Sequence, residues 1–224
     1  MALEDLESAI NYPSLHLDRL CVTFVPTILG KKAYEYVENF SKNFEAILWS
    51  LGQKLSTKNF ELHADELSKP ANRVLEILPH LKPGDLRRIR TTGILPRIEQ
   101  IAELEQWKQL EELCTCEVSR DMFDEKHISH FKRLEFKEDI LSFTYLFRLR
   151  IIMSASDSLD YCLIRPIHGS FQEMEFEHIM DRLGKPTVPP KSNLRHHQIS
   201  GTNKYLEIEL GADLKSLTIT KLTR

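Results

Sequence analysis

Residues 98–136, IEQIAELEQWKQLEELCTCEVSRDMFDEKHISHFKRLEF, contain one helix-to-strand unit and most of a second. Apolar residues recur at three-residue steps from Ile98 to Leu110, with Glu, Gln and Lys between them, which predicts an amphipathic helix. After Leu110 the period changes. Residues 110–116 (LEELCTC) and 131–136 (FKRLEF) both place apolar residues three apart and then alternate at every other residue, which predicts a short strand. A helix, a turn and a brief strand used repeatedly are typical of a leucine-rich-repeat-like stack.

The same strand pattern occurs six times along the chain. The central residues of the six copies are Leu20, Phe60, Ile89, Leu113, Leu134 and Cys162. The last four intervals between these centres fall close to the roughly 20 to 29 residues of leucine-rich repeats, whereas the first interval is longer. The predicted fold class is therefore α/β, a leucine-rich-repeat-like solenoid of alternating helices and short parallel strands with a C-terminal β-hairpin.

The whole chain divides into four parts. We predict an N-terminal leading helix over 1–14, a helix-strand repeat domain over 15–183, a flexible loop over 184–203 and a terminal β-hairpin over 204–224 packed on the same domain. Prolines and polar residues without periodicity mark the loop, and two alternating segments around a Gly-Ala-Asp turn mark the hairpin. Within the repeat domain, helical spacing predicts helices at 31–55, 72–79, 141–153 and 171–183.

Composition and charge exclude several classes of function. The 224 residues carry a net charge of −3, which gives no overall basic field for holding nucleic acid. No apolar run approaches the roughly 18 to 20 residues that cross a bilayer, and the first residues are acidic. We therefore expect a cytoplasmic or nuclear protein with no nucleic-acid or membrane partner.

Few residues suit catalysis or metal binding by their spacing in the sequence. Nine histidines include the pairs His127/His130 and His196/His197, but no Asp, Glu or Cys stands beside either pair at a recurrent metal spacing. The four cysteines are predicted to be buried, reduced thiols, because free cysteine is usually buried. There is no glycine-rich phosphate loop and no nucleophile elbow. We predict no catalytic residue, no metal site, no cofactor and no enzymatic activity.

Alternation along the strands predicts which side chains point away from the core. Trp107 belongs to the apolar stripe of its helix, so we expect it to be buried. The outward residues of neighbouring strands are Arg88, Arg90, Glu112, Arg133, Glu135 and Tyr161. In a solenoid this face is the concave surface on which partners bind. Pairing of these charges across strands is an alternative that is compatible with binding, since a partner can displace such contacts.

Two segments carry a family resemblance. Residues 77–89 read ILPHLKPGDLRRI and residues 101–113 read IAELEQWKQLEEL. Their order resembles the FTH domain, the C-terminal module of the nematode F-box A proteins. Residues 130–134 (HFKRL), 159–164 (LDYCLI) and 205–208 (YLEI) are similar to later parts of that domain, so the resemblance covers roughly residues 15 to 220.

The resemblance implies a noncatalytic protein-interaction module. Members of this family carry an F-box that docks on the Skp-type adaptor of a cullin ubiquitin ligase, and the FTH domain is expected to hold the protein substrate. The F-box pattern is not seen in residues 1–30. A Skp-type partner is therefore expected only if the full-length protein has an F-box, and the alternative is a stand-alone binding scaffold or inhibitor with no ubiquitin ligase link.

Overall fold

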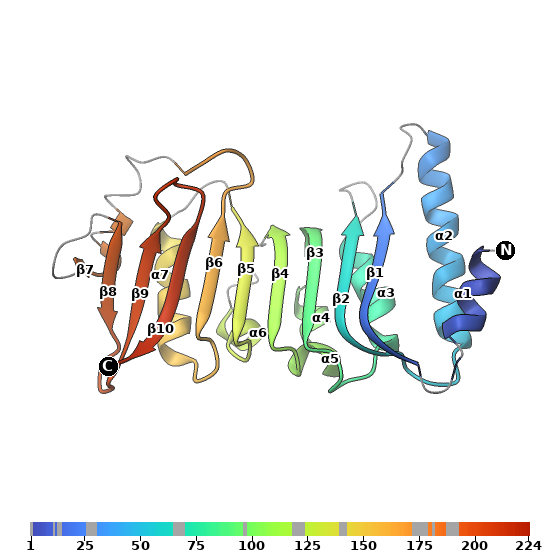
Figure 1. Ribbon diagram of the computed structural model, residues 1–224, viewed down its shortest axis with the longest axis horizontal. Coiled ribbons are helices and arrows are strands. Elements are labelled where there is room, and N and C mark those ends of the chain that lie inside the picture. Colours follow the sequence, from blue (N-terminus) through green and yellow to red (C-terminus); the bar gives the residue numbers. More distant parts are fainter. Residues whose placement is uncertain are drawn as a thin grey trace. The chain divides into compact units, whose positions relative to one another are not determined.

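The chain forms two compact units, Met1–Leu110 and Glu111–Arg224, each with its own sheet strands and helices (Figure 1). The computed structural model describes residues 2–10, 12, 15–25, 31–64, 70–95, 98–117, 124–138, 143–171, 179–180, 182–186 and 193–224. In these ranges, no helix is both long enough and apolar enough to cross a membrane.

The first unit is built on three parallel strands with β2 in the middle. Its strands are β1 (His16–Phe24), β2 (Ser56–Ala64) and β3 (Arg88–Ile94). Its helices are α1 (Ala2–Ile10), α2 (Lys31–Ser50), α3 (Pro70–Ile77) with the short 3-10 helix η2 (Leu78–His80), α4 (Ile98–Ala102) and α5 (Glu105–Lys108). Leu20 lies opposite Phe60, and Phe60 lies opposite Ile89. The first three predicted strand centres are thus in register.

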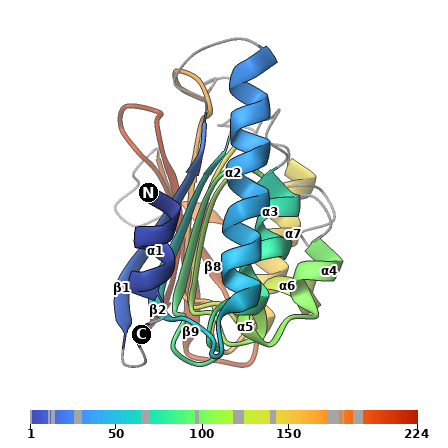
Figure 2. The same ribbon diagram turned by 90° about the vertical axis from the view of Figure 1, so that its right-hand side faces the viewer.

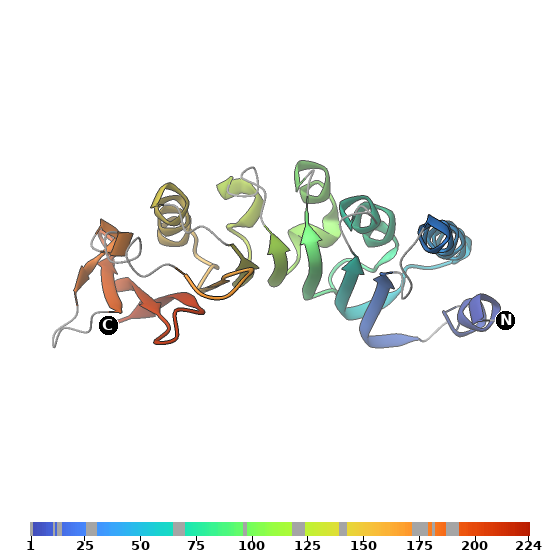
Figure 3. The ribbon, with the colours of Figure 1, turned by 90° about the horizontal axis from the view of Figure 1, so that it is seen from above.

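Helices cover one face of these strands, and among the residues that the structure describes no helix covers the other, which we call the bare face. Helices α2 and α3 stand on the same side of β1 and β2 (Figures 2 and 3), and α3 packs against both β2 and β3. Phe60, Leu62 and Ile89 are fully buried, whereas the alternate residues Asn59 and Arg88 are half-buried. Because successive side chains of a strand point to opposite faces, the buried set lies under the helices and the polar set lies on the bare face.

The two motifs that carry the family resemblance contact each other within this unit. Gln106 of α5 is buried, and its side-chain Nε2 donates to the carbonyl oxygens of Leu81 at 2.7 Å and Pro79 at 3.2 Å. Trp107 beside it is 1% exposed, which confirms its predicted place in the core. The glutamine therefore provides a hydrogen-bond donor to one carbonyl within η2 and to one just after it. Buried carbonyls require such partners.

The second unit combines parallel and antiparallel pairing. Its strands are β4 (Glu112–Glu117), β5 (Arg133–Lys137), β6 (Tyr161–Arg165), β7 (Lys185–Pro186), β8 (Leu194–Gln198), β9 (Lys204–Leu210) and β10 (Leu217–Thr223), and its helices are α6 (Glu125–Ile128) and α7 (Phe143–Ala155). The order is β4-β5-β6-β10-β9-β8-β7, with β4 to β6 parallel and the remaining pairs antiparallel. Leu113, Leu134 and Cys162 lie opposite one another, so the last three predicted centres are also in register.

The end of α7 is tied to this sheet by a buried polar group. The Ser156 hydroxyl accepts from the backbone N–H groups of Ser158 at 3.1 Å and Leu159 at 2.9 Å, and it donates to the carbonyl of Ser129 at 2.5 Å. Lys221 of β10, whose side chain is 3% exposed, donates to the Ser156 carbonyl at 2.5 Å. Burial of the Lys221 ammonium lowers its pKa, and the nearby Asp160 partly offsets this effect.

Four predicted features differ from the structure or lie outside it. The single helix predicted from Ile98 is two short helices, because Leu104 adopts an extended backbone that starts α5 anew. The segment 184–203 predicted as a flexible loop contains β7 and β8, since β8 extends the sheet by pairing with β9. Cys21 is exposed on the bare face of β1 and Cys114 is half-buried, whereas Cys162 is buried as predicted; the side chain of Cys116 lies outside the described residues. Most of the helix predicted at 171–183 lies outside the described residues.

Candidate functional site on the helix-free sheet face

Three of the predicted binding residues lie side by side in the second unit. Glu112 of β4 is opposite Arg133 of β5, which is opposite Tyr161 of β6. All three side chains are half-buried, and α6 and α7 lie on the other face of these strands (Figure 3). The Arg133 guanidinium carbon lies 3.8 Å from the centre of the Tyr161 ring, within the range of a cation–π contact. The strand register therefore presents an acid, a guanidinium and a phenol in one row.

Glu135 is the charged centre of this surface. Arg133 donates to Glu135 Oε1 through Nε at 3.0 Å and Nη2 at 2.7 Å, and Arg165 Nη1 lies 3.7 Å from Oε2. The Cys114 Sγ is also 3.7 Å from Oε2. The Glu135 side chain is only 11% exposed, so its charge is screened from water by these neighbours. The arginine pairs along its own strand, which holds the guanidinium over the Tyr161 ring.

The electrostatics of the pair keep the guanidinium charged. Burial of Arg133 acts to lower its pKa, but the hydrogen bond and charge of Glu135, with a smaller effect of Tyr161, raise it overall. Cys162 of β6 is buried in the core. This burial raises the pKa of its thiol far above the ordinary value, and the Glu135 charge adds to the shift. Cys162 is thus a neutral core side chain at physiological pH, whereas Arg133 carries its full charge on the surface.

The other two predicted residues lie in the first unit. Arg88 and Arg90 of β3 are opposite Asn59 and Glu61 of β2, and both arginines are half-buried on the bare face. Glu61 forms an ion pair with Arg19 of β1. The structure therefore assigns the six predicted residues to two groups, one in each unit, and each group lies on strands whose opposite face is covered by helices.

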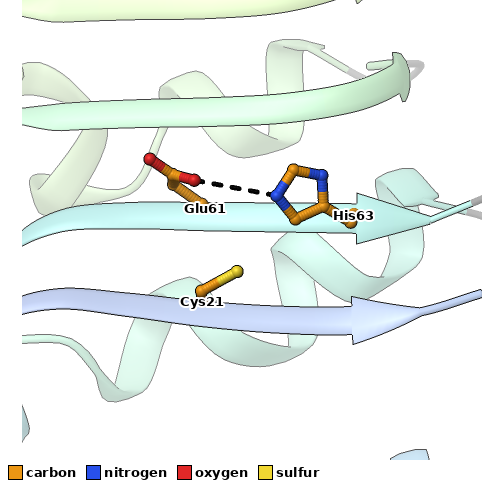
Figure 4. A group of neighbouring side chains, drawn as sticks. All are labelled: Cys21, Glu61 and His63. Carbon is orange, nitrogen blue, oxygen red and sulfur yellow. Dashed lines mark ion pairs between the residues drawn. The ribbon is translucent and has the colours of Figure 1, made fainter.

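The structure brings together one group of side chains that the sequence spacing did not predict. Cys21 of β1 lies beside Glu61 and His63 of β2, and one ligand atom from each of the three lies within 4.8 Å of the others (Figure 4). The residues come from strands about 40 positions apart, so a search for closely spaced ligands misses them. The signal was available in the strand centres, because Leu20 opposite Phe60 also places Cys21 opposite Glu61.

Comparison with known proteins identifies the family. Residues 38–182 match the FTH domain, a range that contains all six predicted binding residues. The chain is 30% identical over 181 residues to F-box A protein 155 of Caenorhabditis elegans, an alignment that covers 78% of this chain and 41% of the relative. The chain thus spans about two fifths of the length of that relative. A domain associated with F-box proteins fits a role in protein interaction. On the extent of the match, the chain belongs to the FTH domain family.

Proposed function

We propose that this protein binds a protein substrate on its helix-free sheet face and serves as the substrate-recognition part of an F-box type, cullin-based ubiquitin ligase receptor. The observation that carries the proposal is the row of Glu112, Arg133 and Tyr161, in which the guanidinium stacks on the phenol. Arginine and tyrosine dominate the energetics of protein interfaces, because each combines a large apolar contact with a directed polar group. The relative's F-box name supports the ligase connection.

The proposal includes the form of the binding face. We infer a leucine-rich-repeat-like arrangement of helix and strand pairs, in which the face without helices is concave and receives an extended segment of the partner. The support is the parallel register of strand centres within each unit. In each unit the guanidiniums, those of Arg88 and Arg90 in the first and that of Arg133 in the second, favour a partner segment with acidic side chains. The role would place the protein in the cytoplasm or the nucleus.

The test compares binding by the wild-type chain with binding by variants of the sheet face, two charge reversals and one truncation. Tagged wild type, Arg133→Glu, Arg88→Glu and Tyr161→Ala are used to capture partners from nematode lysate, and recovered proteins are quantified by mass spectrometry. Lys126→Glu is the matched control, because Lys126 is an exposed cation on α6, on the opposite side of the strands. We expect the recovered amount of the specific partner to fall at least about tenfold in Arg133→Glu and Tyr161→Ala. A tenfold fall corresponds to about 1.4 kcal/mol, and a hot-spot residue contributes about 2 kcal/mol or more.

The outcomes separate the two candidate functions. A partner that is unchanged in all three face variants contradicts the binding face, provided that circular dichroism shows each variant folded. The ligase connection is tested with the full-length gene product. Recovery of a Skp-type adaptor and a cullin together with the partner supports the receptor, whereas recovery of the partner alone supports a stand-alone scaffold or inhibitor.

A further inference from the structure

The helix-free face of the first unit carries three side chains of metal-ligand type. Cys21 is the register partner of Glu61 on the neighbouring strand, and His63 follows Glu61 by two residues on the same face. Figure 4 shows the thiol of Cys21 directed across the gap between the strands toward the carboxylate and the imidazole. We propose that Cys21, Glu61 and His63 form a binding site for a zinc ion, independent of the function proposed above.

The spacing of the ligand atoms suits a tetrahedral ion. With zinc bonds of ordinary length, tetrahedral ligand atoms lie about 3.3 to 3.6 Å apart. His63 Nε2 is 3.6 Å from Glu61 Oε2, and the three ligand atoms all lie within 4.8 Å of one another. The nitrogen and the oxygen are therefore close to the required separation, and the Cys21 sulfur, within 4.8 Å of both, lies no more than about 1.2 Å beyond it.

The chemistry of the donors selects the class of ion. A thiolate, an imidazole and a carboxylate favour zinc, whereas magnesium and calcium prefer sites made of oxygen atoms alone. Thiolate and carboxylate together balance the two charges of the ion, and the Cys21 thiol releases its proton to solvent as the sulfur–metal bond forms. Three protein ligands leave one position of the tetrahedron for water or for a side chain of a bound partner.

Arg19 contacts the carboxylate of the proposed site. It donates to Glu61 Oε2, the same oxygen that faces His63, while Glu61 is only 12% exposed. An ion at this site therefore competes for this oxygen with the Arg19 guanidinium. Its positive charge, with that of Arg90 opposite Glu61, also opposes the ion. We therefore expect reversible binding, weaker than that of a four-ligand structural site.

The second unit contains a similar pair of residues that serves as a control for the proposed zinc site. Cys114 lies opposite Glu135 just as Cys21 lies opposite Glu61, because both pairs stand one residue after aligned strand centres. Two residues after Glu135, however, the chain has Lys137 where the first unit has His63. A cysteine beside a glutamate is thus present twice, but the imidazole that completes the three ligands is present only once.

The experiment is a titration of the whole chain, in reductant without thiols, with Co²⁺ as a spectroscopic substitute for zinc. We expect a thiolate-to-cobalt charge-transfer absorption that saturates at one ion per chain and disappears when Zn²⁺ is added. Cys21→Ser should abolish the band, and His63→Gln should weaken the affinity by at least about tenfold, as expected for the loss of a ligand. The controls Cys114→Ser and His196→Gln should leave band and affinity unchanged, although His196 also lies beside a carboxylate, 3.0 Å from Glu207.

A second measurement keeps the test valid if a variant is unstable. Zn²⁺ should slow alkylation of Cys21 in the wild type and have little effect on that reaction in His63→Gln, as read by mass spectrometry of the Cys21 peptide. A missing thiolate band, a band that persists in Cys21→Ser, or a band lost in Cys114→Ser would each overturn the proposal. Tyr161→Ala, which tests the protein-binding face, should retain the band, so the two proposals fail independently.

Discussion

At the scale of single residues, two carboxylates organise the bare faces of the two units. Glu61 and Glu135 each stand one residue after an aligned strand centre and each pairs with an arginine. A nearly enclosed carboxylate without such a partner would be costly, since desolvation of a charge has to be offset by hydrogen bonds and opposite charge. The arginines therefore stabilise the two carboxylates, and under the proposed function they also present a flat cation to a partner.

The buried thiol of Cys162 makes the stability of the protein sensitive to alkaline pH. Its folded-state pKa is raised by burial above the ordinary value of 9.0, so the unfolded chain loses this proton at a pH where the folded chain keeps it. The unfolded state is then favoured as pH rises above that value. In Cys162→Ala this dependence is absent, so the stability advantage of wild type over the variant should shrink by about 1.4 kcal/mol between pH 7 and pH 10.

The measurement is urea unfolding of wild type and Cys162→Ala at both pH values under reducing conditions. Cys114→Ala is the control, because Cys114 is only half-buried. A difference between wild type and Cys162→Ala that stays constant from pH 7 to pH 10 would show that the thiol is not protected in the folded protein.

At the scale of elements, the break between α4 and α5 turns both Gln106 and Trp107 toward the core. An unbroken helix from Ile98 would follow one apolar stripe, whereas the extended backbone at Leu104 starts a new helix in which Gln106 and Trp107 both face the core. The amide of Gln106 can then reach the carbonyls of Leu81 and Pro79. A polar residue is accommodated in this core because it satisfies two backbone acceptors that have left regular structure.

Gln106→Glu should destabilise the protein strongly. The substitution keeps the shape of the side chain but replaces the donating amide by a carboxylate that faces two carbonyl oxygens. We expect a loss of about 2 to 3 kcal/mol or more in the free energy of unfolding at pH 7. Urea denaturation measures this change in the free energy of unfolding. Gln100→Glu makes the same chemical change at an exposed position of α4 and should alter stability by no more than about 0.5 kcal/mol. Equal effects of the two substitutions would contradict the role given to Gln106.

At the scale of the whole molecule, the match to the FTH domain crosses the boundary between two compact units. Residues 38–182 take strands from both Met1–Leu110 and Glu111–Arg224. Each unit buries its own set of apolar side chains, with Phe60 and Ile89 in the first and Leu134 and Cys162 in the second. Local stability can therefore differ between the units, because cooperative unfolding follows densely packed regions.

Hydrogen exchange should report this division. Gln106→Glu is expected to accelerate amide exchange mainly in β2 and β3, whereas Ser156→Ala, which deprives two backbone N–H groups of their acceptor, should act mainly on α7, β6 and β10. Exchange measured by mass spectrometry on wild type and both variants provides the comparison. Equal acceleration throughout the chain in both variants would mean that the two units unfold as one.

The sequence by itself determined the six repeat strands, their register within each unit and the family, but it predicted a loop where β7 and β8 lie. Alternation around Leu20, Phe60, Ile89, Leu113, Leu134 and Cys162 was sufficient, because a strand buried on one face must repeat its apolar residues with a period of two. The choice of outward residues followed from the same period. Tertiary structure alone decided the stacking of Arg133 on Tyr161, the pairing of Arg133 with Glu135, the pairing of β8 with β9, and the approach of the Cys21, Glu61 and His63 ligand atoms to within 4.8 Å. These contacts depend on which strands become neighbours and on side-chain rotamers, and neither is encoded in the local period of a single segment.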